Sequence, residues 1–158
     1  MPETTTTHEW IEKVLEEHRQ LNAMVADLRL FLEAPRPEVG QKGAHVWSTE
    51  LTRRLVQLHE ALFCHFREEE EGGMMEELTE AHPRATGAVA GLVQEHEEML
   101  RDLRRCTSGA MEYSDGVEPD DAALRRRITC ILDCLHKHEV AETDLIQRLE
   151  YEEIGPVD

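Results

Sequence analysis

Residues 124–149 read LRRRITCILDCLHKHEVAETDLIQRL, and apolar residues recur in this stretch at steps of three and four. Such spacing places them on one face of an α-helix, because a helix turns once every ~3.6 residues. The stripe consists of Leu124, Ile128, Ile131, Leu135, His138, Glu142, Leu145 and Leu149. This stretch therefore predicts a long helix whose buried face includes two polar side chains, His138 and Glu142.

Three other segments, which begin at Ile11, Leu51 and Val89, carry the same kind of stripe. Helices are expected over about residues 7–33, 44–71, 83–110 and 120–152. No segment has the alternating pattern of a strand. Four long helices with short connections predict an all-α chain that forms an up-down-up-down antiparallel four-helix bundle, in a single domain over residues 1–158.

Helix-breaking residues mark the connections between these helices. Gly40 and Gly43 are expected to lie in the first loop, and Gly72-Gly73 to end the second helix. Residues 74–81 are expected to form a short helical turn before the third long helix.

Six polar residues interrupt the four apolar stripes, and they form two matched sets. Each set has a lone His on one helix, followed on the next helix by a His and a Glu four residues apart. The two sets are His18, His65 and Glu69, then His96, His138 and Glu142. The separation between the two His is 47 residues in the first set and 42 in the second. Two imidazoles and one carboxylate per half form a ligand set suited to non-haem iron.

These polar residues are costly to bury one at a time. An unpaired polar group in a protein interior costs roughly 1–3 kcal/mol. A single His on such a face is most simply a hydrogen-bonded core residue. Six of them at matched spacing instead predict convergence on shared metal ions, because coordination would offset the cost of their burial.

The combined pattern resembles the hemerythrin-like domain, also called the HHE cation-binding domain, over about residues 8–152. The resemblance rests on the series His18 … His65-x-x-x-Glu69 … His96 … His138-x-x-x-Glu142. It implies a four-helix bundle that holds two non-haem iron ions, which in such a centre can share an oxo or hydroxo bridge. The implied ligands are His18 and His65 for one iron, His96 and His138 for the other, and Glu69 and Glu142 as bridges.

Two departures from the oxygen carriers of this family affect the expected function. The carriers have a further His one turn after the His of the third long helix, where this chain has Leu100 in the segment His96-Glu-Glu-Met-Leu100. They also use an Asp five residues after the last His, where this chain has Glu142 after four. The set is more similar to bacterial iron-centre repair proteins and iron-sensing members, which argues against reversible oxygen transport.

His59 is a candidate flanking ligand on the second helix. It precedes His65 by six residues, a rotation of about 120° around the helix, but it adjoins Leu58 on the buried face. His136 is expected to face away from the site. The remaining acidic residues at the end of the second helix are expected to be solvated: Glu68, Glu70 and Glu71.

Composition limits the classes of partner. The formal net charge of −17 argues against nucleic acid and anionic membrane surfaces. No apolar run approaches the ~18 residues of a membrane span, and the first residues lack the pattern of a secretory signal, so a cytoplasmic location is expected. The four cysteines lack zinc-site spacing and are expected to be reduced. Cys130 and Cys134, one helical turn apart, leave a redox role open.

The sequence leaves three functions open. In the first, the protein supplies too few ligands to fill the coordination of two iron ions, so that exchangeable positions remain. The chain would then react with or sense oxygen, peroxide or nitric oxide. Alternatively, it stores iron or donates it for the repair of iron centres in an accepting protein. The third alternative is a metal-stabilised structural bundle. No nucleophile, phosphate loop or substrate-pocket motif is recognisable, so the sequence establishes neither an enzymatic activity nor an oligomeric state.

Overall fold

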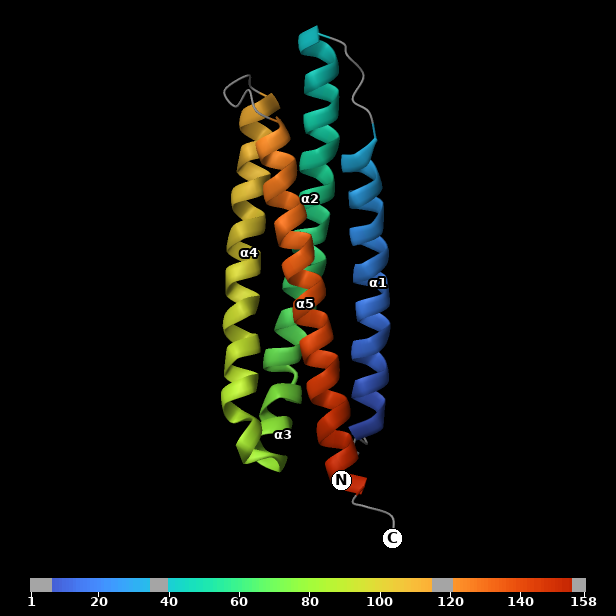
Figure 1. Cartoon of the computed structure of the whole chain (residues 1–158), viewed down its shortest axis with the longest axis vertical. Coiled ribbons are helices and arrows are strands. Elements are labelled where there is room, and N and C mark those ends of the chain that lie inside the picture. Colours follow the sequence, from blue (N-terminus) through green and yellow to red (C-terminus); the bar gives the residue numbers. More distant parts are fainter. Residues whose placement is uncertain (1–6, 35–39, 115–120, 155–158) are drawn as a thin grey trace.

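The computed structural model describes residues 7–34, 40–114 and 121–154, which are helical almost throughout (Figure 1). The four long helices are α1 (Thr7–Glu33), α2 (Gly40–Glu71), α4 (Thr86–Ser114) and α5 (Asp121–Ile154). Two short elements, α3 (Met74–Ala81) and η1 (Pro83–Ala85), connect α2 to α4. No strand occurs in these residues, which confirms the predicted all-α class. Over the same ranges, no helix is both long and apolar enough to cross a membrane.

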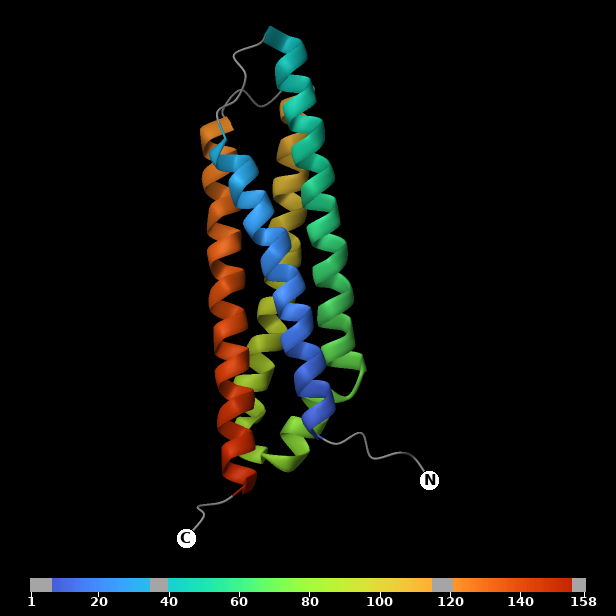
Figure 2. The same cartoon turned by 90° about the vertical axis from the view of Figure 1, so that its right-hand side faces the viewer.

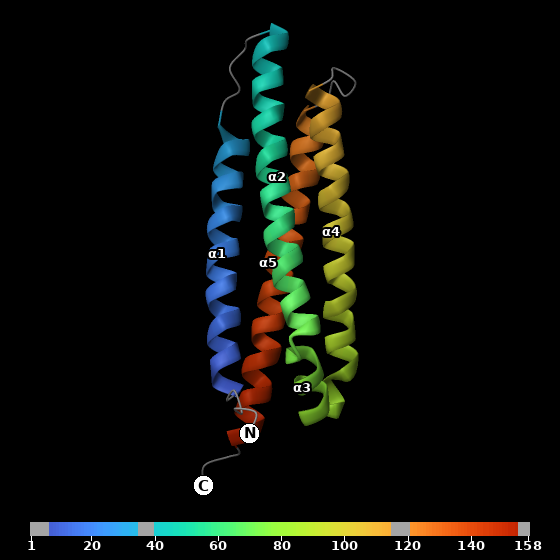
Figure 3. The ribbon, with the colours of Figure 1, turned by 180° about the vertical axis from the view of Figure 1, so that it is seen from behind.

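The long helices run alternately up and down, side by side (Figure 2). α2 and α5 each pack against both α1 and α4, so the helices form a ring in the order α1, α2, α4, α5. α1 begins and α5 ends at the end of the bundle where α3 lies, and α3 packs below α2 and beside α4 (Figure 3). The predicted antiparallel four-helix bundle is confirmed.

Two glycines and a proline make the turn out of α2. Gly73 has a φ of 93°, in the left-handed region that favours glycine. A side chain at Gly72 would collide with the backbone carbonyl oxygen of Glu68. Pro83 then begins η1, where the missing N–H costs no hydrogen bond within the helix. The chain therefore leaves α2 at the two glycines and reverses its direction over α3 and η1 before it enters α4.

Two helix starts differ from the sequence-based expectation. Gly40 and Gly43 lie inside α2 and not in the loop before it. A glycine costs only about 1 kcal/mol in a helix, and the first N–H groups have no partner within the helix in any case. The third long helix begins at Thr86, after the 3₁₀ turn, and continues to Ser114 instead of ending near residue 110.

A layer of buried His and Glu divides the core into two apolar clusters. On α5, for example, Leu135 belongs to the larger cluster and Leu145 to the smaller one, which lies toward α3. His138 and Glu142 lie between them in the sequence and are equally buried. The polar layer is thus held in place by regular helix packing on both sides, and its position does not depend on loops.

Candidate metal centre

Six buried side chains from all four long helices meet in this polar layer. α1 and α4 each contribute one His, and α2 and α5 each contribute a His and a Glu one helical turn apart. The six residues are His18, His65, Glu69, His96, His138 and Glu142, and none is more than 6% exposed. The structure thus brings together all six residues that the sequence pattern indicated.

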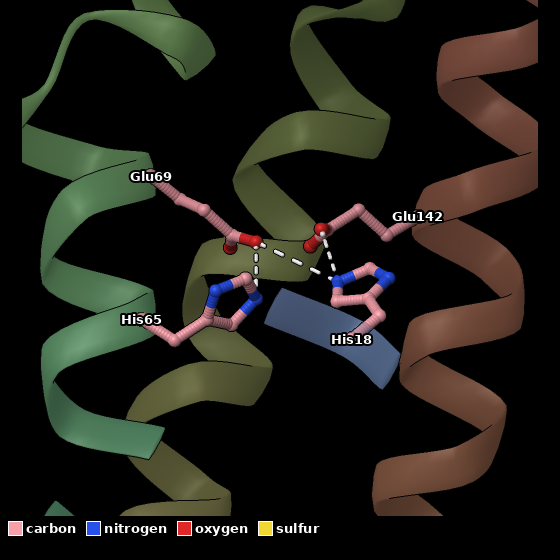
Figure 4. Close-up of side chains that lie close together, drawn as sticks. All are labelled: His18, His65, Glu69 and Glu142. Atoms are coloured by element: carbon pink, nitrogen blue, oxygen red, sulfur yellow. Dashed lines mark ion pairs between the residues drawn. The ribbon is translucent and has the colours of Figure 1, made fainter. Parts of the chain in front are cut away.

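The nitrogen and oxygen atoms of these side chains form two groups that share one carboxylate, Glu142. Within each group, one atom from each residue lies within 4.8 Å of the others. The first group, in which the side chains point toward one another in Figure 4, consists of His18, His65, Glu69 and Glu142. The second group consists of His96, His138 and Glu142.

Glu69 spans the two groups. Its Oε1 lies 2.6 Å from Nε2 of His65, on one side of the layer. Its Oε2 lies 3.3 Å from Nε2 of His96, on the other side. One carboxylate therefore faces an imidazole of each His pair with a separate oxygen.

Glu142 spans the layer in the same way from the opposite helix. Its Oε1 lies 3.2 Å from Nε2 of His18, and its Oε2 lies 3.3 Å from Nε2 of His138. Two carboxylates that each direct one oxygen to either His pair have the arrangement of bridging ligands between two metal ions. The bridging role that the family resemblance implied for both glutamates stays a prediction.

Several atoms at the centre are buried without a hydrogen-bond partner. They are Nε2 of His18 and both carboxylate oxygens of Glu69 and Glu142. Their neighbours lie at ion-pair distances but not in hydrogen-bond geometry. An unpaired buried polar group costs about 1–3 kcal/mol, and such groups are rare in native proteins. Cations between these atoms would satisfy all of them, so the donor set fits a metal centre.

The buried carboxylates and imidazoles of the centre shift one another's pKa values. Burial opposes protonation of His18, but interactions with Glu142 and Glu69 outweigh it and raise the pKa of His18 to about 10. The same two carboxylates raise the pKa of His96 to about 9 against the effect of burial. Burial also disfavours the charge on Glu142, but His138, His18 and His96 hold its pKa well below the usual range. In the metal-free state, protons on imidazoles therefore balance the carboxylate charge.

Two further glutamates orient the paired His residues. Nδ1 of His65 donates to Oε2 of Glu17 at 2.6 Å, and Nδ1 of His138 donates to Oε2 of Glu95 at 2.6 Å. With Nδ1 engaged in this way, Nε2 is left to face the centre. Neither glutamate is among the residues that the sequence pattern indicated. Each immediately precedes the lone His of its half, and this repeated Glu-His pair is the signal that could have identified them.

One residue of the acidic run at the end of α2, Glu70, is not simply solvated, in contrast to the expectation from the sequence. Oε2 of Glu70 lies 3.4 Å from Nδ1 of His96, so this glutamate approaches the outer side of the ring. The other two acidic residues form surface ion pairs, Glu68 with Lys13 and Glu71 with Arg67.

The two halves of the centre are not equivalent. In the first half, the residue after the paired His is Phe66, which stacks on His96 with ring centroids 3.9 Å apart and an interplanar angle of 5°. In the second half the corresponding residue is Glu139, which is 5% exposed and whose Oε1 has no hydrogen-bond partner. Burial raises the pKa of Glu139, and the nearby His18 opposes this rise. Neither residue belongs to the sequence pattern, because each lies ~100° away from the buried stripe of its helix.

His59 lies outside both groups of ligand-type atoms. Its ring lies parallel to that of Phe63, with centroids 6.5 Å apart, and both burial and the charge of Arg104 on α4 lower its pKa. Six residues correspond to about 9 Å along a helix, which separates His59 from His65. The structure does not bring this candidate flanking ligand to the centre. His136 is exposed, as expected.

Leu100, one turn after His96, is partly buried and packs against the larger apolar cluster. It offers no ligand atom to the centre.

The cysteines are all free; Cys106 is buried, whereas Cys64, Cys130 and Cys134 are exposed. None belongs to either group of ligand-type atoms. The redox role for the Cys130 and Cys134 pair stays a prediction.

A sequence profile of the hemerythrin HHE cation binding domain matches residues 10–153. The matched segment runs from α1 to α5 and contains all six residues of the polar layer. Comparisons with curated proteins and with solved structures found no match. Because the profile covers most of the sequence, the chain belongs to the hemerythrin HHE cation-binding domain family.

Proposed function

We propose that this protein binds two non-haem iron ions in the polar layer and uses them to react with or sense oxygen, peroxide or nitric oxide. One ion is held by His18 and His65, and the other by His96 and His138. Glu69 and Glu142 bridge the two ions. The observation that carries the proposal is the orientation of these two carboxylates. In each of them, one oxygen faces the first His pair and the other oxygen faces the second His pair.

The donor set favours iron and leaves room for a small ligand. Each ion receives two imidazoles and one oxygen from each bridging carboxylate, which is a mixed nitrogen and oxygen set suited to iron. Iron prefers more ligands than these four, so exchangeable positions remain. Iron bound in this way supplies redox electrons and open coordination positions for small molecules. Leu100 adds no ligand, so these positions are not filled from α4.

Iron storage or donation to an accepting protein is the second candidate function. Two surface hollows reach the layer, one at His18 and the other at Glu69. Through these hollows, an accepting group or a chelator could reach the side chains that hold the metal. Labile iron that passes quickly to a chelator would favour this function over a retained reactive centre.

An optical spectrum before and after exposure to air tests the primary proposal. Protein purified without oxygen in the presence of ample iron should contain close to two irons per chain. Its spectrum should change rapidly in air, with little recovery under vacuum, because Leu100 leaves the centre without the extra imidazole of the oxygen carriers. A single metal, or a centre filled by redox-inert zinc, would contradict the proposal and favour a structural role. A spectrum that recovers fully under vacuum would restore oxygen transport.

Metal binding is expected to release protons in a pH-dependent way. The pKa of His18 is about 10 and that of His96 is about 9 in the metal-free state, so both rings carry protons at pH 7. A metal ion must displace these protons, because only neutral imidazole coordinates. Against the effect of burial, Glu69 and Glu17 also raise the pKa of His65, so loading at pH 7 in weak buffer should release at least two protons per chain. The apparent affinity should rise as pH increases toward 9–10. An affinity that is flat between pH 6.5 and 9 would contradict the assigned protonation.

Loss of the outer partner of His138 is expected to weaken metal binding without removing a ligand. Glu95→Ala removes the acceptor for Nδ1 of His138, and such changes typically cost about 10–100-fold in metal affinity. Glu95→Gln keeps an acceptor oxygen but loses the charge, so its effect should be smaller. Glu97→Gln is the matched control, since Glu97 is exposed on the same helix. Equal affinities for all three variants, measured by chelator competition, would show that Glu95 does not support the centre.

A further inference from the structure

Glu139 is a buried carboxylate that belongs to neither group of ligand-type atoms. It is 5% exposed, and its Oε1 has no hydrogen-bond partner. Burying such a group is costly, and the cost is normally offset by a partner. The sequence does not place Glu139 on the stripe that forms the core, so helix packing does not explain it. Asn22 interacts with the carboxyl group, but Oε1 is left free to take a further ligand.

Glu139 adjoins a route from solvent to the metal centre. A groove of about 370 Å³ lies between α1 and α5, which are neighbours in the bundle (Figure 2). We call it the α1–α5 groove, and its lining includes His18, Asn22, His136, Glu139, Val140 and Asp144. His18 therefore contacts both this groove and the first group of ligand-type atoms. Arg19 also lines the groove, but it pairs with Glu16 at 2.6 Å, which balances its charge.

On the His96 and His138 side, the position equivalent to Glu139 is apolar. Phe66 occupies the position in the first half that Glu139 occupies in the second, and its ring covers His96 face to face. It also meets His138 edge to face, with centroids 5.7 Å apart. The apolar ring covers the His96 and His138 pair, and the outer carboxylates on that side, Glu95 and Glu70, already face the Nδ1 atoms of these two rings. On the His18 side, Oε1 of Glu139 is left without a partner, which favours this side as the approach for a cation.

A second hollow, lined by residues from α1, α2 and α3, is the competing route. It measures about 270 Å³, and its lining includes one cation, Lys13, and four carboxylates, Glu17, Glu68, Glu69 and Glu77. The ammonium of Lys13 lies 3.1 Å from Glu68 and 4.0 Å from Glu17. A metal ion that entered here would meet carboxylates that are already engaged, Glu68 with Lys13 and Glu17 with His65. In the α1–α5 groove, by contrast, Oε1 of Glu139 has no hydrogen-bond partner.

We propose that the α1–α5 groove is the route by which divalent metal reaches the centre, and that Glu139 binds the incoming ion transiently and passes it to His18. The inference rests on the proposed metal binding and adds its route. A carboxylate oxygen is a suitable ligand for Fe²⁺ and can replace part of its water shell before the ion reaches the imidazoles. Because Glu139 is a ligand only in transit, it affects the rates of uptake and release and not the final coordination.

The test measures both rates with Co²⁺, whose visible absorption reports its coordination and which takes similar ligands to Fe²⁺. Uptake is followed by stopped-flow after mixing the full-length metal-free chain with Co²⁺, and release by adding a chelator to the loaded protein. Glu139→Gln should slow both rates by roughly tenfold, as expected for loss of an attracting charge on an access path. Because both rates change by the same factor, the affinity and the final spectrum should stay unchanged.

Two matched pairs of variants separate this route from general effects of charge and size. Glu97→Gln removes the same charge from an exposed site on α4 and should leave both rates unchanged. Val140→Trp should narrow the groove and slow both rates, since Val140 lines it and is 46% exposed. Val56→Trp makes the same change at a site that is 41% exposed on α2 and should have no effect.

The outcomes that overturn the proposal are distinct. Rates for Glu139→Gln that equal those of Glu97→Gln would remove Glu139 from the route. A weaker final affinity with an altered spectrum would make Glu139 a permanent ligand. Faster uptake in Lys13→Gln, with no effect of Glu139→Gln, would move the route to the second hollow. If the unsubstituted chain takes up no metal, the proposed function fails; if it does and the variants behave alike, only the route fails.

Discussion

Glu142→Ala is expected to remove both metal ions under conditions that saturate the unsubstituted protein. One oxygen of Glu142 lies 3.2 Å from His18 and the other 3.3 Å from His138, so the substitution takes a ligand from each proposed ion at once. Loss of an outer partner alone typically costs about 10–100-fold in metal affinity, and loss of a shared ligand should exceed that for both ions. Metal analysis after desalting measures the effect directly.

Comparison with single-site variants tests the bridging role. Glu69→Ala should also weaken both ions, because its two oxygens face His65 and His96. His18→Ala should first weaken one ion. His59→Ala should leave the metal content unchanged, since His59 lies outside both groups of ligand-type atoms. The bridging interpretation is wrong if Glu142→Ala is folded by circular dichroism and still retains one ion at full affinity.

Removal of the metal is expected to destabilise the bundle strongly without unfolding it. Ligands that bind only the native state stabilise it by about 2.7 kcal/mol per site when free metal is 100 times the dissociation constant. For a domain of this size, one such site corresponds to a shift of roughly 5–11 °C in the melting temperature. Thermal melts of chelated and iron-loaded protein, followed by circular dichroism, measure the difference.

The two apolar clusters are the reason why the metal-free chain should stay helical. They lie on either side of the polar layer, and the larger cluster includes fully buried side chains such as Leu55, Leu103 and Leu124. Leu55→Ala should cost about 2–5 kcal/mol, and this cost should be similar with and without metal because Leu55 lies in the cluster and not in the polar layer. A random-coil spectrum for chelated protein at room temperature would show that the metal, and not the apolar core, holds the bundle together.

The sequence determined the bundle and the composition of its polar layer. A stripe with a step of three and four residues fixes which side of each helix is buried, since the period of a helix is a local property of the chain. His138 and Glu142 could therefore be assigned to the interior from residues 124–149 alone. Helix starts were less accurate, as Gly40 and Gly43 show, because propensities at a helix end differ by only about 1 kcal/mol.

The tertiary structure decided which groups surround that layer. Glu17 and Glu95 each hold a His on a different helix, 48 and 43 residues away, and no periodic pattern within one helix encodes such a contact. Phe66 and Glu139 occupy equivalent positions in the two halves, yet one covers an imidazole and the other lies in a groove. These differences depend on how closely and at what rotation neighbouring helices pack. Sequence periodicity specifies the buried face of each helix, but only the packed bundle determines which side chains of other helices meet it.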